Sequence, residues 1–179
     1  IRQVAEIEIL PRFRSLSSDE QWHKEAGGLV TIADIQSENF LSSALSDLLP
    51  GSLILGEEGS SKMDQPYRCL EEDAPVWIID PLDGTNNFAK GKEDFAVIVA
   101  LSVSKNIRAG WIYAPMHNLL TVAEEGAGGW IGNQRLRVSG SCRADQMRGS
   151  LGRRFRDYPG MVDRFASVSN ARCCGMEYL

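Results

Sequence analysis

One segment, Trp77–Phe88, constrains the fold of this chain more than any other feature of its sequence. It begins within an apolar run, Val76–Ile79, of the kind that forms a buried strand. Asp80 follows directly, Pro81 fixes a turn, and Asp83 brings a second carboxylate back beside the first. The sequence therefore predicts a strand that ends at a pair of acids, and such a pair favours binding of a hard cation.

A helix start follows the two acids. Gly84 and Thr85 open a predicted helix whose first backbone N–H groups have no partner inside it, so they can bind an anion such as phosphate. The backbone carbonyl of Leu82 can add an oxygen ligand without adding charge. Because carboxylate, carbonyl and phosphate oxygens together favour magnesium over zinc, we expect a Mg²⁺ and phosphate site here.

Two further acids, Glu57 and Glu58, follow an apolar stretch that predicts another short strand at 52–55. If both predicted strands end at one edge of a sheet, Glu57 becomes the third acid ligand. A metal ion held by these acids makes bound water far more acidic than bulk water, so no covalent nucleophile is required. We expect the hydroxyl group of Thr85 to orient that water.

The acids also allow two other interpretations. Asp80 and Asp83 could serve only to cap a turn or a helix, a common use of aspartate beside glycine and proline. The pattern Asp-x-Asp-Gly-Thr marks haloacid-dehalogenase-type phosphatases, whose first aspartate forms a phospho-enzyme. Here Pro81 occupies the position of that nucleophile, since the two acids are spaced one residue further apart. The spacing therefore favours metal-activated water over covalent aspartate catalysis.

The remaining patterns predict an α+β fold, with helices packed on a largely antiparallel sheet. A second helix is expected at 34–49, where apolar residues at helical spacing end at a Pro-Gly pair. The first helix is predicted from four apolar residues at helical spacing: Val4, Ile7, Leu10 and Phe13. Apolar stretches between turn signals predict antiparallel meander strands and a final hairpin at 95–103, 108–113, 119–122 and 136–138.

The net charge, the cysteine spacing and the apolar runs restrict which molecules this chain is expected to bind and where it is expected to be located. The formal net charge of −5 gives no basic face for nucleic acid, so we expect no nucleic-acid binding. The four cysteines lack the CxxC spacing of a zinc site, and we interpret them as reduced, mostly buried thiols. No charged and apolar leader and no run of 18 apolar residues is present, so neither secretion nor a membrane span has support, and we expect a cytoplasmic location.

Three motifs, in order along the chain, resemble the inositol monophosphatase family of lithium-sensitive, magnesium-dependent phosphatases. They are Leu29–Asp34 with Glu38, Gly56–Glu58, and Trp77–Phe88. A Gly-rich stretch at 121–130 also resembles the family segment that follows the third motif. The resemblance implies a sugar-phosphatase-like layered α/β sandwich.

The resemblance also implies roles for individual residues. Two or three Mg²⁺ ions would be held by Glu57, Asp80, Asp83 and the carbonyl of Leu82, with Asp80 bridging two metal positions. Three residues would contact the substrate phosphate: Asp83, Gly84 and Thr85. Asp34 would hold outer waters and Glu58 would support the ligands, although Asp34 could equally be a helix N-cap.

The resemblance covers nearly the whole chain but only about the first two thirds of a family member. We therefore expect residues 1–179 to be the amino-terminal α+β part of such a domain, with 140–179 beginning a truncated second layer at an Arg-x-x-Gly segment. The carboxy-terminal layers would be missing. They would include a Trp-Asp motif that completes the second metal position and the residues that hold the substrate ring.

The implied function is Mg²⁺-dependent hydrolysis of a small polyol phosphate, with inositol monophosphate as the family default, by metal-activated water. The resemblance also implies a homodimer. Two alternatives stay open. One is a related phosphatase for histidinol phosphate, fructose bisphosphate or nucleotide phosphates, because the missing segment normally decides specificity. The other is a catalytically silent metal- and phosphate-binding module.

Overall fold

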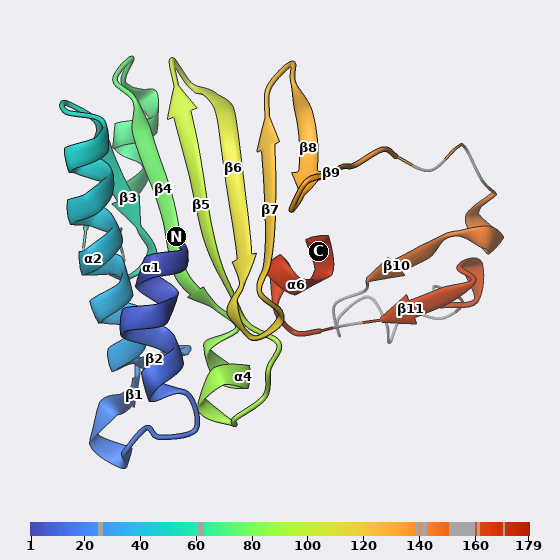
Figure 1. Cartoon of the computed structure of the whole chain (residues 1–179), viewed down its shortest axis with the longest axis horizontal. Helices are drawn as coiled ribbons and strands as arrows, with labels where there is room; N and C mark the ends of the chain where they lie inside the picture. Colours follow the sequence, from blue (N-terminus) through green and yellow to red (C-terminus); the bar gives the residue numbers. More distant parts are fainter. Residues whose placement is uncertain are drawn as a thin grey trace.

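A seven-stranded sheet lies at the centre of the computed structural model (Figure 1). The structure describes residues 1–24, 27–60, 63–138, 140, 143–150, 160, 162–169 and 171–179. The sheet strands, in spatial order, are β3 (Leu53–Gly56), β4 (Val76–Asp83), β5 (Ala96–Val103), β6 (Asn106–Ala114), β7 (Leu119–Glu124), β8 (Gly128–Ile131) and β9 (Gln134–Arg135). β3 pairs with β4 in parallel and the other neighbours pair antiparallel, which confirms the predicted largely antiparallel sheet.

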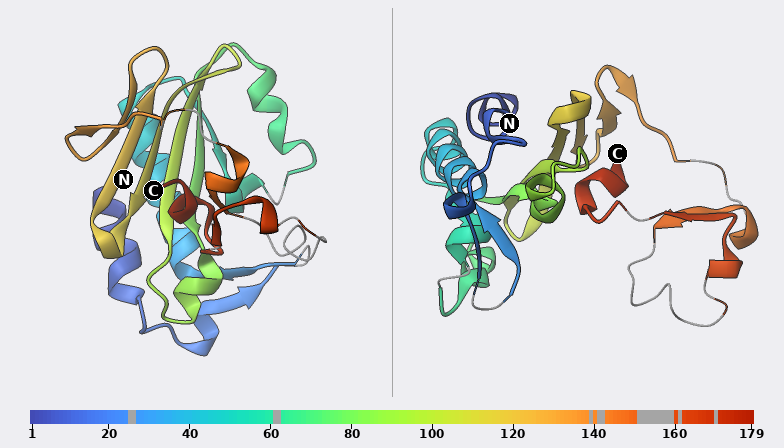
Figure 2. Two further views of the ribbon diagram at one scale, coloured as in Figure 1. Left: turned by 90° about the vertical axis from the view of Figure 1, so that its right-hand side faces the viewer. Right: turned by 90° about the horizontal axis from the view of Figure 1, so that it is seen from below.

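Helices lie on both faces of the sheet (Figure 2). The amino-terminal helical turns and the long helix α2 (Ile32–Leu48) cover one face, and the short helix α6 (Cys174–Tyr178) lies on the other, against β5 and β6. The amino-terminal turns are α1 (Arg2–Val4), η1 (Ala5–Ile9) and η2 (Leu10–Arg12). The remaining short elements are η3 (Ser18–Glu20), β1 (Gln21–His23), β2 (Leu29–Thr31), α3 (Glu57–Ser60), η4 (Pro66–Glu71), α4 (Thr85–Ala89), η5 (Pro115–His117), η6 (Ala144–Gln146), β10 (Arg148–Ser150), η7 (Val162–Arg164) and β11 (Ser167–Ser169).

The predicted first helix is present, but its buried face was partly wrong. Val4 and Ile9 are fully buried, whereas Ile7 is 47% exposed. The turn from Ala5 to Ile9 is π-helical, and its i→i+5 hydrogen bonds widen the turn, so the spacing of a regular α-helix does not hold there. Val4 and Ile9 therefore face the core together.

The predicted strand at 76–79 is confirmed, but it does not end at Asp80. β4 continues to Asp83 through a register shift, where pairing with β5 moves from Asp80 opposite Ile98 to Asp83 opposite Ala96. A proline has no N–H to donate to the sheet, so Pro81 is accommodated where the regular pairing is interrupted. The two acids are thus brought together by an irregular strand and not by a turn that ends it.

Other boundaries also differ from the sequence prediction. Glu57 and Glu58 follow β3 directly, as predicted, but they open the short helix α3. The final hairpin strand, β9, lies at Gln134–Arg135, and Val138, which was predicted to be in it, is 98% exposed. An unpredicted antiparallel hairpin, β1 and β2, leads into α2.

The carboxy-terminal part is described in pieces, because 139, 141–142, 151–159, 161 and 170 lie outside the described residues. Its β10 and β11 form a separate parallel pair, and α6 returns to the central sheet. Among the cysteines, Cys173 is buried, Cys69 half-buried and Cys174 exposed, so the expectation of mostly buried thiols was wrong for two of these three; Cys142 is not among the described residues. No helix in the described ranges is long and apolar enough to cross a membrane.

Candidate metal and phosphate site

Three of the predicted acids meet at one edge of the sheet. The parallel pairing of β3 with β4 sets Gly56 opposite Ile79, so the residues that follow each of them, Glu57 and Asp80, emerge side by side. Burial of the Asp80 carboxyl, together with the charges of Glu57 and Asp83, raises the pKa of Asp80 to about 8. Burial is the largest cause of this shift, and the like charges of Glu57 and Asp83, which follow β3 and end β4 beside Asp80, add to it.

The chemistry of this donor set fits a hard divalent cation. Oxygen ligands with several negative charges are what Mg²⁺ selects, and a bound cation would offset both the burial and the like charges that raise the pKa of Asp80. Within the described ranges, no group of three or more His, Cys, Asp or Glu side chains is already arranged to hold a metal ion. All three acids instead carry protein partners: Asp80 accepts a hydrogen bond from the backbone N–H of Leu82 at 3.2 Å, Glu57 contacts Lys24, and Asp83 contacts Gly175.

Asp83 is contacted by the carboxy-terminal end of the chain. Its Oδ2 accepts a hydrogen bond from the backbone N–H of Gly175 and lies 3.1 Å from the Sγ of Cys173. Burial of Cys173, together with its contact with Asp83, raises the pKa of its thiol. A Cβ on Gly175 would lie 2.7 Å from the Cβ of Ala96, so the close approach to Asp83 requires glycine there. Sequence reasoning assigned Cys173 and Gly175 no role in the site.

Asp34 connects helix α2 to the site. Its Oδ2 accepts hydrogen bonds from the backbone N–H and the hydroxyl of Thr31, the N-cap of α2, at 2.8 and 2.6 Å. Its other oxygen, Oδ1, accepts a hydrogen bond from the hydroxyl of Thr85 at 2.8 Å. Burial raises the pKa of Asp34, which is 1% exposed. The prediction that Asp34 could be the helix N-cap was therefore wrong, because Thr31 is the N-cap and Asp34 is the third residue of the helix in a capping box. Its role beside the metal ligands stays a prediction.

The helix start after the acids is formed as predicted. Gly84 is the N-cap of α4 and has φ +89°, a conformation that favours glycine. A Cβ on Gly84 would lie 2.9 Å from the backbone oxygen of Asp94, so space also requires glycine. The hydroxyl of Thr85 lies 3.0 Å from the carbonyl oxygen of Leu82, which places that carbonyl beside the Thr85–Asp34 pair.

Glu38 fixes the start of α3. Its carboxylate accepts hydrogen bonds from the backbone N–H groups of Glu58 and Gly59, each at 2.7 Å. A Cβ on Gly56 would lie 2.3 Å from Cδ of Glu38, so glycine makes this approach possible. Glu38 belongs to the first resembling motif, but sequence reasoning gave it no role, because its contact depends on how α2 packs against the end of β3.

Lys24 contacts both acids of α3. Its Nζ lies 3.0 Å from Oε1 of Glu57 and 2.8 Å from Oε1 of Glu58. Glu58 is 5% exposed, and this burial raises the pKa of its carboxyl despite the contact with Lys24. Sequence reasoning did not identify Lys24, since nothing in its neighbourhood predicted the hairpin that brings it here.

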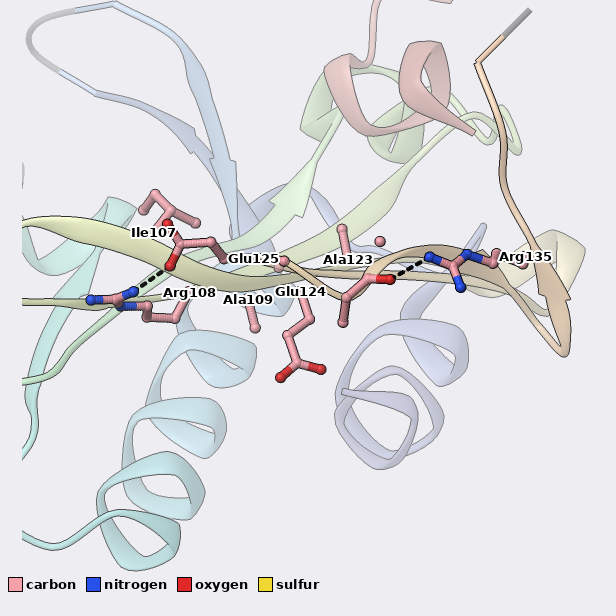
Figure 3. Close-up of a pocket in the computed structure, with 11 residues that line it drawn as sticks. Ile107, Arg108, Ala109, Ala123, Glu124, Glu125 and Arg135 are labelled. Atoms are coloured by element: carbon pink, nitrogen blue, oxygen red, sulfur yellow. Dashed lines mark hydrogen bonds and ion pairs between the residues drawn. The ribbon is translucent and has the colours of Figure 1, made fainter.

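A hollow lies at the opposite end of the sheet, where β6 begins and β7 ends (Figure 3). Its basic side chains already have partners: Arg108 forms an ion pair with Glu125, and Arg135 donates to the backbone oxygen of Ala127 at 2.7 Å. Glu57, which follows β3, and the acids of β4 are at the other end, so this hollow is separate from them.

The fold and the site together define a layered α+β protein of the sugar-phosphatase type, with acids at a sheet edge beside a Gly-Thr helix start. Residues 3–156 match the profile of the inositol monophosphatase family. The chain belongs to this family. The match includes each predicted site residue, from Asp34 to Thr85.

Two relatives and one solved structure illustrate the similarity. The chain is 37% identical over 131 residues to an inositol monophosphatase of Dictyostelium discoideum, covering 73% of this chain and 46% of the relative. It is 30% identical over 132 residues to a fructose-1,6-bisphosphatase/inositol-1-monophosphatase of Thermotoga maritima, covering 74% and 48%. An IMPase/NADP phosphatase solved with Mg²⁺ and phosphate has the same fold, with a TM-score of 0.80 at 23% identity over 98% of this chain and 66% of that one. The chain thus spans less than half the length of these two relatives.

Proposed function

We propose that this chain is the amino-terminal part of a Mg²⁺-dependent phosphomonoesterase that hydrolyses a small polyol phosphate, with inositol monophosphate as the substrate. The observation that carries the proposal is the meeting of Glu57, Asp80 and Asp83 at one sheet edge, beside the hydrogen-bonded pair of Thr85 and Asp34. The relatives, which are named as phosphatases of small phosphorylated molecules, support it.

The metal would be held by four groups: the carboxylates of Glu57, Asp80 and Asp83 and the carbonyl of Leu82. Bound Mg²⁺ supplies charge neutralisation at the phosphoryl group and makes a water molecule more nucleophilic. Two or three ions would share these ligands, with Asp80 between two of them. The solved relative that holds Mg²⁺ and phosphate supports the choice of metal.

The chain's own residues would position the reactants. The hydroxyl of Thr85 donates a hydrogen bond to Asp34, which leaves an oxygen lone pair free to accept a hydrogen bond from an attacking water and so to orient it. Asp34 is held by Thr31, so this orientation is fixed before substrate binds. We propose that Gly84 and Thr85, together with Asp83, contact the phosphate. Glu58 and Asp34 would hold these groups in position without contacting it.

The finer parts of this proposal rest on resemblance. The relatives' names also include fructose bisphosphate and NADP among substrates, so related phosphomonoesters, including histidinol phosphate, are the alternatives to inositol monophosphate. A homodimer, a cytoplasmic location and a second layer beginning within 140–179 stay predictions. The second candidate function is a silent metal- and phosphate-binding module, favoured by the protein partners that Glu57 and Asp83 already have.

The decisive test replaces Asp83 by asparagine and measures phosphate release from inositol monophosphate across a Mg²⁺ titration. We expect Asp83→Asn to lower kcat/KM by roughly a hundredfold or more, because a metal contributes several kcal/mol to transition-state stabilisation. Asp47→Asn, an exposed change on α2, is the matched control and should leave the rate unchanged. Turnover that survives Asp83→Asn or chelation of Mg²⁺ would refute the proposed metal mechanism. Metal binding without turnover in the complete protein would favour the silent module.

A further inference from the structure

Lys24 places a positive charge among the acids of the candidate site. Its ammonium group contacts Glu57, a proposed metal ligand, and Glu58, the neighbouring acid, at 3.0 and 2.8 Å. The side chain of Lys24 is 19% exposed, that of Glu58 7% and that of Glu57 47%, so the contact with Glu58 is withdrawn from water and the contact with Glu57 is partly so. An ion pair with such shielding is screened less by salt than one on the open surface.

The backbone around Lys24 is fixed by the β1–β2 hairpin. Its N–H donates to the carbonyl of Gly28 at 3.0 Å, and its own carbonyl accepts from Gly27 at 2.9 Å. The hairpin pairs Gln21 with Thr31, the N-cap residue that also binds Asp34. The hairpin is therefore anchored beside the site, and the long side chain of Lys24 is the part that can move without breaking these backbone bonds.

We propose that the ammonium group of Lys24 is an internal cation that pairs with Glu57 in the metal-free protein and is displaced from it when Mg²⁺ binds. This inference rests on the function proposed above. The ammonium group neutralises part of the negative charge of the cluster formed by Glu57, Asp80 and Asp83. Lys24 acts as a positioning residue: it holds Glu57 in place, and Mg²⁺ must compete with it.

The difference in charge decides whether Mg²⁺ or the Lys24 ammonium group binds Glu57. A divalent ion interacts about twice as strongly as a monovalent one with the same carboxylate at equal separation. It can also bind several acids at once, whereas Lys24 reaches the acids of α3. Mg²⁺ therefore displaces the ammonium group, but its apparent affinity is reduced by the free energy of the ion pair that it breaks. Removal of the Lys24 charge should strengthen Mg²⁺ binding.

The test measures Mg²⁺ binding to the 179-residue chain by calorimetry, without reference to turnover. We expect Lys24→Met to bind Mg²⁺ about two- to fivefold more tightly than the parent, the range that breaking a partly exposed ion pair would give. Lys24→Arg keeps the charge and should resemble the parent. Lys105→Met, at the exposed tip between β5 and β6, is the matched control and should have no effect. Circular dichroism confirms that each variant is folded.

A second readout follows Lys24 itself. Acetylation by an amine-reactive reagent, quantified at Lys24 by mass spectrometry, should increase when Mg²⁺ is saturating, whereas acetylation of Lys105 should not change. If the parent binds Mg²⁺ but Lys24→Met binds equally or more weakly, or acetylation of Lys24 does not rise, the inference is overturned and the metal site still stands. If neither the parent nor Lys24→Met binds Mg²⁺, the metal-site proposal fails, and the inference fails with it.

Discussion

The hydroxyl group of Thr85 is the smallest feature on which the proposed reaction depends. It lies 2.8 Å from Asp34, which burial and the N-cap contact with Thr31 hold in one orientation. A hydroxyl fixed in this way presents a lone pair in a constant direction, and orientation of a reactant contributes strongly to rate. The chemical step should therefore be more sensitive to this group than substrate binding is.

We predict that Thr85→Ala lowers kcat by roughly a hundredfold, the lower range for loss of a group that orients or accepts a proton. KM should change little, since the backbone N–H groups proposed to contact phosphate are retained. Steady-state kinetics with inositol monophosphate and saturating Mg²⁺ provides the measurement. Thr85→Ser keeps the hydroxyl and should recover most of the activity. An equal loss in the serine and alanine variants would show that the methyl group, and not the hydroxyl, matters.

At the scale of elements, the site depends on how α2 supports the end of β3. Glu38 of α2 reaches the start of α3 through the space left by Gly56, and so fixes the helix that carries Glu57. This contact links the first and second of the three motifs. These two motifs therefore act together to hold the start of α3, which sequence spacing could not reveal.

We predict that Gly56→Ala destabilises the chain by about 1–3 kcal/mol, the usual cost of overpacking, because its Cβ would meet the Glu38 carboxylate. Gly110→Ala, in β6 of the same sheet, is the matched control, since its nearest contact would be an ordinary 3.9 Å. Urea unfolding measures both. In a Glu38→Ala background the cost of Gly56→Ala should shrink, and a double-mutant cycle tests this coupling. Additive effects would contradict the proposed clash.

At the scale of the whole molecule, the acids that would bind Mg²⁺ also lower the stability of the metal-free protein. A buried carboxyl beside two like charges, as at Asp80, is retained at a cost that metal binding can reverse. The same residues that would bind Mg²⁺ should therefore weaken the metal-free protein. This relationship gives a test that does not depend on the identity of the substrate.

We predict that Mg²⁺ at a hundred times its Kd raises the melting temperature of the parent chain by roughly 5–10 °C, which corresponds to about 2.7 kcal/mol of linkage in a protein of this size. Asp80→Asn should be at least as stable as the parent without metal, because it removes a buried acid, and should lose most of the Mg²⁺-induced rise. Thermal unfolding with and without a chelator measures both effects. A full Mg²⁺ response in Asp80→Asn would contradict its role as a ligand.

Patterns confined to one stretch of chain predicted much of the fold. The helix at 34–49, the strand at 76–79 and the antiparallel meander are all found, because apolar periodicity and turn residues act locally. Failures came where the backbone departs from regular geometry. The π-turn at Ala5–Ile9 changed which side chains are buried, and the register shift between Asp80 and Asp83 carried β4 past Pro81.

The segment Trp77–Phe88 and its acids could be recognised from the sequence alone, because a strand, two carboxylates and a glycine at a helix start are encoded by adjacent residues. Tertiary structure alone decided what surrounds them. Lys24, Glu38 and Gly175 reach Glu57, Glu58 and Asp83 from distant parts of the chain. Such contacts depend on the parallel pairing of β3 with β4 and on the packing of α2 and α6 against the sheet. No local pattern fixes how such elements meet, since their approach is set by the packing of side chains across the whole core.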